Sequence, residues 1–249
     1  MKKIFSSLLI VSFLLLTLTG CGPANNSNNS NGNKNNGSKN NNTTDTSQLK
    51  NMITSYEKYS EAKGALLEKI TDEENYNLSL SLGLLPVALV DFALILPAAI
   101  CGLDKTEVSY WSLLYTGFNY DVNGNKCTIT YNDDGEIRKY VTEYDAASDS
   151  VKMEVFTGDK LELVSEYIKV GSGYASQYYS ASDDTASIYR IIFDDKNISV
   201  GIFDDNQRPS SIYKNASGLN EEWTRNEQFW AQYKNGVTTG IINGEAIGN

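Results

Sequence analysis

The sequence predicts an α+β fold in which N-terminal helices pack on a large antiparallel β meander sheet. Apolar residues recur at helical spacing up to about residue 76 and alternate with polar residues from about residue 107 onward. In the second region, clusters of Asn, Asp and Gly recur at roughly ten-residue spacing, which is typical of strands joined by turns. We therefore expect one domain over residues 47–249, helical over 47–105 and a β meander over 107–249.

The first 20 residues have the layout of a secretory signal peptide. Lysines at positions 2 and 3 precede an apolar run over residues 4–18, which is shorter than the about 20 residues of a membrane span. Leu18, Thr19, Gly20 and Cys21 resemble the lipobox of bacterial prolipoproteins, a likeness confined to residues 1–21. It implies cleavage before Cys21 and attachment of a diacylglycerol to its thiol, since two or more acyl chains anchor a protein stably. An ordinary secretory signal or an uncleaved anchor is the alternative.

Residues 22–46 consist mostly of Asn, Ser, Gly and Thr, with three charged residues, Lys34, Lys39 and Asp45. Such a segment has too little apolar surface to offset the entropy of ordering, so we expect a flexible tether. At ~5–6 Å × √n it would span on the order of 25–30 Å. Its bias toward Asn and Lys resembles surface lipoproteins of low-GC Gram-positive bacteria. This resemblance implies a location at the outer face of the bacterial cell membrane.

The apolar residues of the first helical region, Leu49, Met52, Tyr56, Tyr59, Leu66 and Ile70, recur every three or four positions. They predict an amphipathic helix from Ser47 to about Tyr76, with Asp45 and Gln48 as a capping pair. The next segment, 78–103, is long enough for a membrane span. Its one charge, Asp91, would cost ~2.5–3.5 kcal/mol at the bilayer centre, and prolines 86 and 97 would break a helix. We expect a buried hairpin or helix pair, with a lipid-contacting surface as the alternative.

The strand region shows clear two-residue alternation in "SVKMEVF", with Val151, Met153 and Val155 on one face, and in "NISVGIF", with Ile198, Val200 and Ile202. Turns are expected at 123–126, 132–135, 157–160, 171–173, 183–185, 194–197, 204–209 and 234–236. Every second turn of a meander lies at the same end of the strands. This arrangement would bring seven acidic residues to one end of the sheet: Asp133, Asp134, Asp159, Asp183, Asp184, Asp204 and Asp205. Turns at the same end lie about 9–10 Å apart, too far to share one calcium ion, so no metal site is expected.

Cysteines and aromatic residues leave two questions open. Cys101 and Cys127 form a disulfide or stay as two free buried thiols, because an extracellular location permits either. Thirteen of the 16 tyrosines fall between residues 110 and 233. With Trp111, Trp223 and Trp230 they are sugar-stacking platforms or half-buried strand residues, and the second interpretation is favoured because Tyr is a good strand former.

Composition excludes several functions. The net charge of −10 disfavours nucleic acid as a partner, because such binding depends on Lys and Arg. The chain has no histidine, so Ser-His and Cys-His catalytic arrangements are absent. It also has no glycine-rich phosphate loop, and no cofactor is expected.

The sequence therefore favours a membrane-anchored surface lipoprotein with a binding or interaction role and an unidentified ligand. A lipid or apolar-ligand carrier is one alternative, since a sheet curling round an apolar segment is loosely similar to lipoprotein-carrier half-barrels. A carboxylate-based extracellular hydrolase is the other, although no pair among the 31 acidic residues stands out. Binding is favoured over enzymatic activity.

Overall fold

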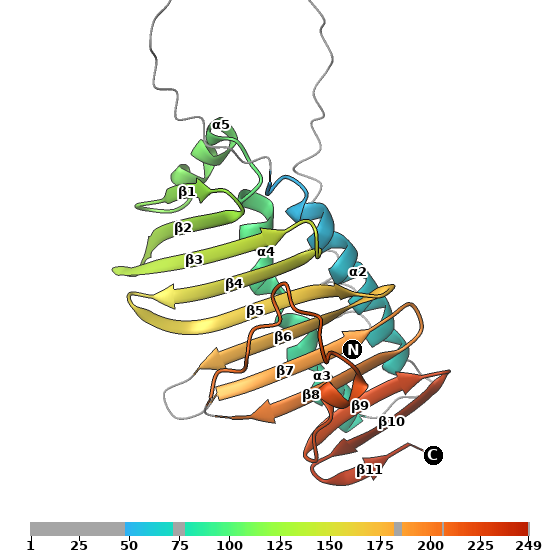
Figure 1. Cartoon of the computed structure of the whole chain (residues 1–249). Helices are drawn as coiled ribbons and strands as arrows, with labels where there is room; N and C mark the ends of the chain where they lie inside the picture. Colours follow the sequence, from blue (N-terminus) through green and yellow to red (C-terminus); the bar gives the residue numbers. More distant parts are fainter. Residues whose placement is uncertain (1–47, 72–77, 182–185, 206, 249) are drawn as a thin grey trace, which may run out of the picture. The chain divides into compact units, whose positions relative to one another are not determined.

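The computed structural model describes residues 48–71, 78–181, 186–205 and 207–248. Within them, helices cover one face of a single 11-stranded antiparallel sheet (Figure 1). The predicted α+β class, with helices packed on a meander, is confirmed.

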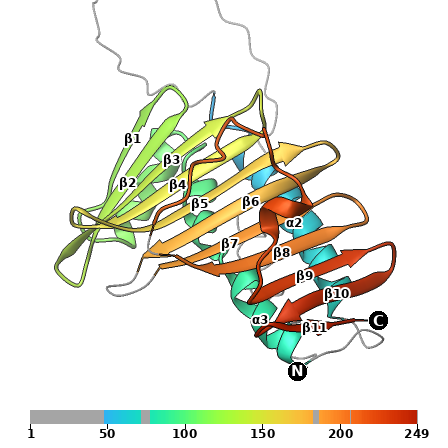
Figure 2. The same ribbon diagram turned by 60° about the horizontal axis from the view of Figure 1, so that its bottom comes forward.

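The sheet is a complete meander, in which every strand pairs with the next one along the chain (Figure 2). It begins later than predicted, at Asn119, because residues after Asp104 form a short helix, α5 (Lys105–Ser109), and a 3-10 helix, η2 (Tyr110–Leu113). Asp104 and Glu107 make a capping box that fixes the start of α5. The strands are β1 (Asn119–Asn123), β2 (Lys126–Asp133), β3 (Glu136–Asp145), β4 (Ser150–Thr157), β5 (Lys160–Val170), β6 (Gly173–Ala181), β7 (Ala186–Phe193), β8 (Ile198–Asp204), β9 (Phe229–Lys234), β10 (Val237–Ile242) and β11 (Glu245–Ile247).

Helix α2 (Met52–Ile70) places its apolar stripe against the sheet. All six stripe residues predicted from the spacing are buried. The predicted start is wrong: residues 48–51 form a turn, so Gln48 precedes the helix and does not cap it, and Asn51 at the N-cap makes no side-chain capping bond. Asp45 lies outside the described residues. The predicted end near Tyr76 is also wrong, because the helix ends at Ile70 and Thr71 is its C-cap.

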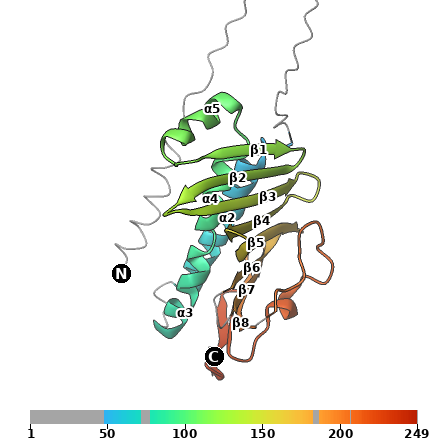
Figure 3. The same ribbon diagram turned by 90° about the vertical axis from the view of Figure 1, so that its left-hand side faces the viewer.

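Helices α3 (Leu78–Leu89) and α4 (Phe92–Ile100) follow one another along the same face of the sheet (Figure 3). The helix pair is present, but the predicted break points are wrong, because Pro86 and Pro97 lie inside the helices. An interior proline removes one helix hydrogen bond and disfavours the helix, yet each of these helices continues through its proline. The chain breaks at Val90 and Asp91 instead.

The predicted strand faces agree with the structure. Val151, Met153 and Val155 on β4 are buried toward the helices, as are Ile198 and Val200 on β8, and Ile202 packs partly buried against the same core. Most predicted turn clusters connect consecutive strands, although residues 183–185 lie outside the described part.

The cluster at 204–209 is the exception to the predicted short turns. It leads into a long connection that returns to β9, and we call residues 207–228 the strap. The strap contains the 3-10 helix η3 (Glu221–Thr224) and lies on the face of the sheet opposite α2, α3 and α4 (Figure 3). Ile212 of the strap forms a second small core with Ile168 and Ala175.

Candidate functional site

A row of polar side chains crosses the strap face of the sheet at directly paired positions. It runs from β2 to β7 through Lys126, Glu143, Lys152, Glu166, Gln177 and Arg190. The strap uses this row as its attachment. Glu166 accepts hydrogen bonds from Ser211 Oγ at 2.5 Å and from the Ile212 amide at 2.9 Å. The buried carboxylate of Glu166 is therefore fully engaged in holding the strap.

A second polar group is buried between the helices and the sheet, around Asp91. Its carboxylate forms an ion pair with Lys63, and the two side chains are only 7% and 3% exposed. Tyr59 donates a hydrogen bond to Asp91 Oδ1 at 3.0 Å, and Lys63 also donates to the Val87 carbonyl at 3.1 Å. Burial, followed by the nearby Asp91 charge, raises the pKa of Tyr59 well above its usual value.

Aromatic and hydroxyl groups continue this network toward the β3–β4 turn. Tyr59 stacks on Tyr167 with ring centroids 4.4 Å apart, and Tyr167 Oη lies 2.9 Å from Ser55 Oγ. Ser55 donates to Asp149 Oδ1 at 2.5 Å, and Tyr174 donates to Asp149 Oδ2 at 3.1 Å. These contacts bind α2 to the sheet through both charge and stacking.

The network lies in a closed interior. The gap beside it, lined by Met52, Tyr56, Leu94 and Tyr167 among others, has no room for a water-sized molecule. The ionisable groups there already satisfy one another. Their arrangement is that of a structural cluster, and a substrate has no space to reach them.

Helices α3 and α4 carry two opposite apolar stripes. The inner stripe faces the core and consists of Leu80, Leu84, Val87, Asp91, Leu94 and Ala98, which alternate in steps of four and three. The outer stripe consists of Leu82, Leu85, Leu89 and Phe92, in steps of three, four and three, with exposed fractions of 58%, 38%, 37% and 42%. The expectation that residues 78–103 form a buried core is therefore correct only for the inner stripe.

The stretch Leu80–Ile100 is long enough and apolar enough to cross a membrane, and 39% of it is buried. Burial of the inner stripe and pairing of Asp91 show that it packs on the sheet along one side. The exposed residues of this stretch are the outer stripe and Pro86.

The strap face carries an open cleft of about 450 Å³ near the β7–β8 turn. Its polar lining includes Asp194, Asn197, Glu221, Glu222 and Lys234. Lys234 Nζ lies 2.7 Å from Glu221 Oε1. The hydrogen bond from Lys234 lowers the pKa of Glu221 below its usual value. The cleft also has an apolar lining of Val170, Ile192, Phe193 and Ile198, and two of its charged residues, Glu221 and Lys234, pair with each other.

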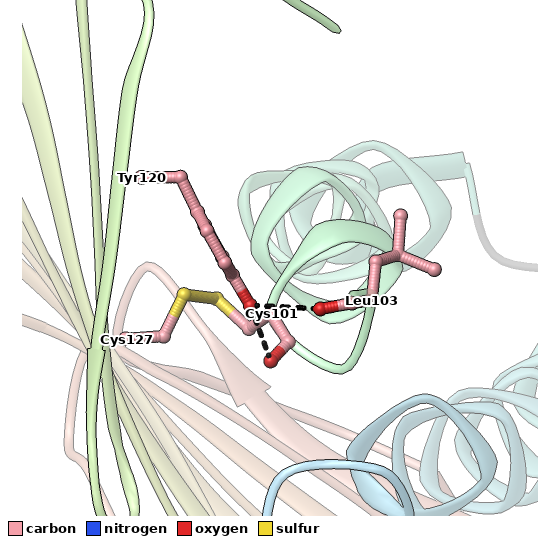
Figure 4. Close-up of a disulfide and its surroundings, with 4 residues drawn as sticks. All are labelled: Cys101, Leu103, Tyr120 and Cys127. Carbon is pink, nitrogen blue, oxygen red and sulfur yellow. Dashed lines mark hydrogen bonds between the residues drawn. A yellow bond between two sulfur atoms is a disulfide. The ribbon is translucent and has the colours of Figure 1, made fainter. Parts of the chain in front are cut away.

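Cys101 and Cys127 are joined by a disulfide, which settles in the structure the choice left open by the sequence. The bond ties the end of α4 to β2, and both residues are fully buried (Figure 4). Beside it, Tyr120 Oη lies 3.2 Å from the carbonyl oxygens of both Cys101 and Leu103. Cys21, the predicted lipid-attachment residue, lies outside the described residues.

The other candidates from the sequence occupy structural positions. Five of the turn aspartates lie in turns or at strand ends, all at the same end of the strands: Asp133, Asp134, Asp159, Asp204 and Asp205. Asp183 and Asp184 are outside the described part. Over the described ranges, no three His, Cys, Asp or Glu side chains are arranged to hold a metal ion. Trp230 donates to Ser199 Oγ at 3.0 Å, and Trp111 and Trp223 pack against the main and second cores.

The partner of Asp91 was missed in the sequence. Lys63 stands four residues after Tyr59 and three before Leu66, so it occupies a position on the apolar stripe of α2. A lysine at such a position is buried only with a partner. The position of Lys63 on this stripe therefore indicates a buried ion pair.

Comparison of the chain with protein-family models, curated proteins and solved structures finds no match.

Proposed function

We propose that this protein is a lipid-anchored binding protein at the outer face of a bacterial membrane. The observation that carries the proposal is the sequence Leu18-Thr19-Gly20-Cys21, which ends an apolar run and precedes a polar segment. A folded domain then follows over residues 48–248. Anchor, spacer and domain in this order suit a protein that presents a surface near the membrane.

Binding is favoured over catalysis by the placement of the charged groups. Asp91 and Lys63 neutralise each other in a closed interior, and Glu166 is occupied by the strap. In the open cleft, Glu221 is paired with Lys234. A carboxylate pair for hydrolysis needs an accessible acid and base at a defined separation. Asp91 and Glu166 are buried and occupied, and in the cleft Glu221, which feels the charge of Asp194, is paired with Lys234.

The disulfide gives independent support for a location outside the cytoplasm. Disulfides form and persist in oxidising compartments. A bond between Cys101 and Cys127 agrees with export through the predicted signal peptide.

The proposal is tested by metabolic labelling of the full chain with a fatty acid in a bacterial host. We expect label in the wild type and none in Cys21→Ser, which should also change membrane fractionation or processing. The matched control is Cys101→Ser/Cys127→Ser, which removes the two other cysteines of the chain and should keep the label. Equal labelling of wild type and Cys21→Ser, or none in either, contradicts the proposal.

A further inference from the structure

We propose that the outer stripe of α3 and α4 docks on the surface of the lipid bilayer. Leu82, Leu85, Leu89 and Phe92 form this stripe, and each exposes more than a third of its surface. Exposed apolar side chains that line up on one helix face mark a contact site more strongly than scattered ones do. The inference rests on the membrane anchoring proposed above, which it deepens by naming the contact surface.

The two stripes point in opposite directions, and only one of them carries a charge. Asp91 is the one charged residue in segment 78–103, and it belongs to the inner stripe, where Lys63 neutralises it. The outer stripe therefore presents no charge to a partner. A charge held near the bilayer centre would oppose insertion of this segment as a span, whereas contact along the outer stripe keeps Asp91 on the protein side.

The outer stripe exposes a small apolar area. If each side chain exposes on the order of 200 Å² when free, the four together offer roughly 350 Å². A stable protein partner, including a second copy of this chain, buries about 800 Å² on each side. The stripe is too small for such an interface by itself. Shallow contact with lipid has no such threshold, because its strength scales with the apolar area buried.

The length of chain that precedes the domain limits how far the domain can lie from Cys21. Residues 22–46 separate Cys21 from the described part, and a segment of that length spans on the order of 25–30 Å as a coil. The 21-residue stretch Leu80–Ile100 is about 30 Å long at 1.5 Å per residue. A domain held at that distance can lay the stretch along the bilayer. Tethering also raises the effective concentration of a weak contact.

The test uses residues 21–249 with Cys21→Ser, which keeps every described helix and strand and carries no lipid. We expect this protein to float with phosphatidylcholine vesicles, and Leu82→Ser/Leu89→Ser in the same background to reduce the bound fraction at least fivefold. The matched control is Ile137→Ser, because Ile137 is 60% exposed, close to the 58% of Leu82, but lies on the strap face of the sheet. It should bind as the parent does.

Circular dichroism and thermal unfolding check that the variants fold. A second measurement does not depend on the serine variants. Phe92→Trp keeps the stripe apolar, and vesicles with brominated lipid should quench the fluorescence of the added tryptophan. Absence of vesicle binding by the parent overturns the inference, as does equal binding by Leu82→Ser/Leu89→Ser. A dimer in light scattering that this variant abolishes assigns the stripe to a second copy and also overturns it. Because the fatty-acid labelling uses lipidated chain and this assay does not, failure of anchoring and failure of docking give different results.

Discussion

Lys63 on α2 and Asp91 before α4 form an ion pair in which both side chains are almost completely buried. The pair joins the two helical elements on one side of the sheet, and Tyr59 adds a hydrogen bond to the same carboxylate. Two charges removed from water stabilise a fold only while both are present, because either one alone is an uncompensated buried charge.

The first prediction follows from this pair. Lys63→Met should lower the free energy of unfolding by about 3–5 kcal/mol, since it leaves Asp91 charged and buried. Lys63→Met/Asp91→Leu should recover most of that loss. The control, Lys69→Met on the exposed side of α2, should stay within about 0.5 kcal/mol of the wild type. Urea unfolding measures all three, and a double variant no more stable than Lys63→Met would contradict the explanation.

The second prediction concerns the disulfide. Cys101 and Cys127 are separated by 26 residues, and closing a loop of that size in the unfolded chain contributes about 3–4 kcal/mol. Cys101→Ala/Cys127→Ala should therefore unfold at a lower urea concentration, and reducing agent should lower the midpoint of the wild type but leave that of the variant unchanged. A reductant effect of the same size in both proteins would show that it does not act through this bond.

The meander and its faces could be predicted because alternation and turn chemistry are local signals. Val151, Met153 and Val155 alternate with charged neighbours, and clusters such as "NGNK" mark tight turns directly. The strap could not be predicted in the same way. It opens with a turn-like cluster at 204–209, and Ile212 packs on a face of the sheet where Glu166 and Gln177 suggested solvent.

Among the site features, the outer stripe was hidden by the uniform hydropathy of its segment. Residues 78–103 are apolar on every side, so their sequence has no amphipathic pattern that distinguishes Leu82, which is exposed, from Leu84, which is buried. The distinction depends on which side meets the sheet. Gly83 allows this contact, because a Cβ there would meet the ring of Phe229 on β9.

The third prediction concerns the strap. Glu166→Gln removes the negative charge and leaves one acceptor oxygen where the Ser211 hydroxyl and the Ile212 amide now have two, so the strap should loosen and stability should fall by about 1.5–3 kcal/mol. Trypsin should then cut faster after Lys214 or Arg225, the basic residues of the strap that no proline follows. Glu162→Gln on the same strand is the control. Glu162 pairs with Arg138 near the surface, and its loss should cost at most about 1 kcal/mol.

The fourth prediction concerns residues 22–46. Because their composition offers almost no apolar surface to pack, deleting them should leave the unfolding midpoint of the remaining domain within error. Thermal unfolding of residues 21–249 and 47–249, both without lipid, gives the comparison. A clear drop in the midpoint of the shorter chain would show that this segment packs on the domain.

The last prediction concerns stability at alkaline pH. Burial, followed by the charge of Asp149 and the hydrogen bond to it, raises the pKa of Tyr174 to about 12, and burial raises the pKa of Tyr178 to about 12 as well. Tyrosines of the unfolded chain titrate near 10. The folded state therefore holds these protons more tightly, so their contribution to stability is complete below about pH 10 and is lost as the pH rises through about 12. Thermal unfolding between pH 9 and pH 12 should show the midpoint falling in that window, less steeply in Tyr174→Phe/Tyr178→Phe. Absorbance at 295 nm should show delayed ionisation in the folded wild type, and an identical pH dependence in both proteins would rule out these two phenols as its source.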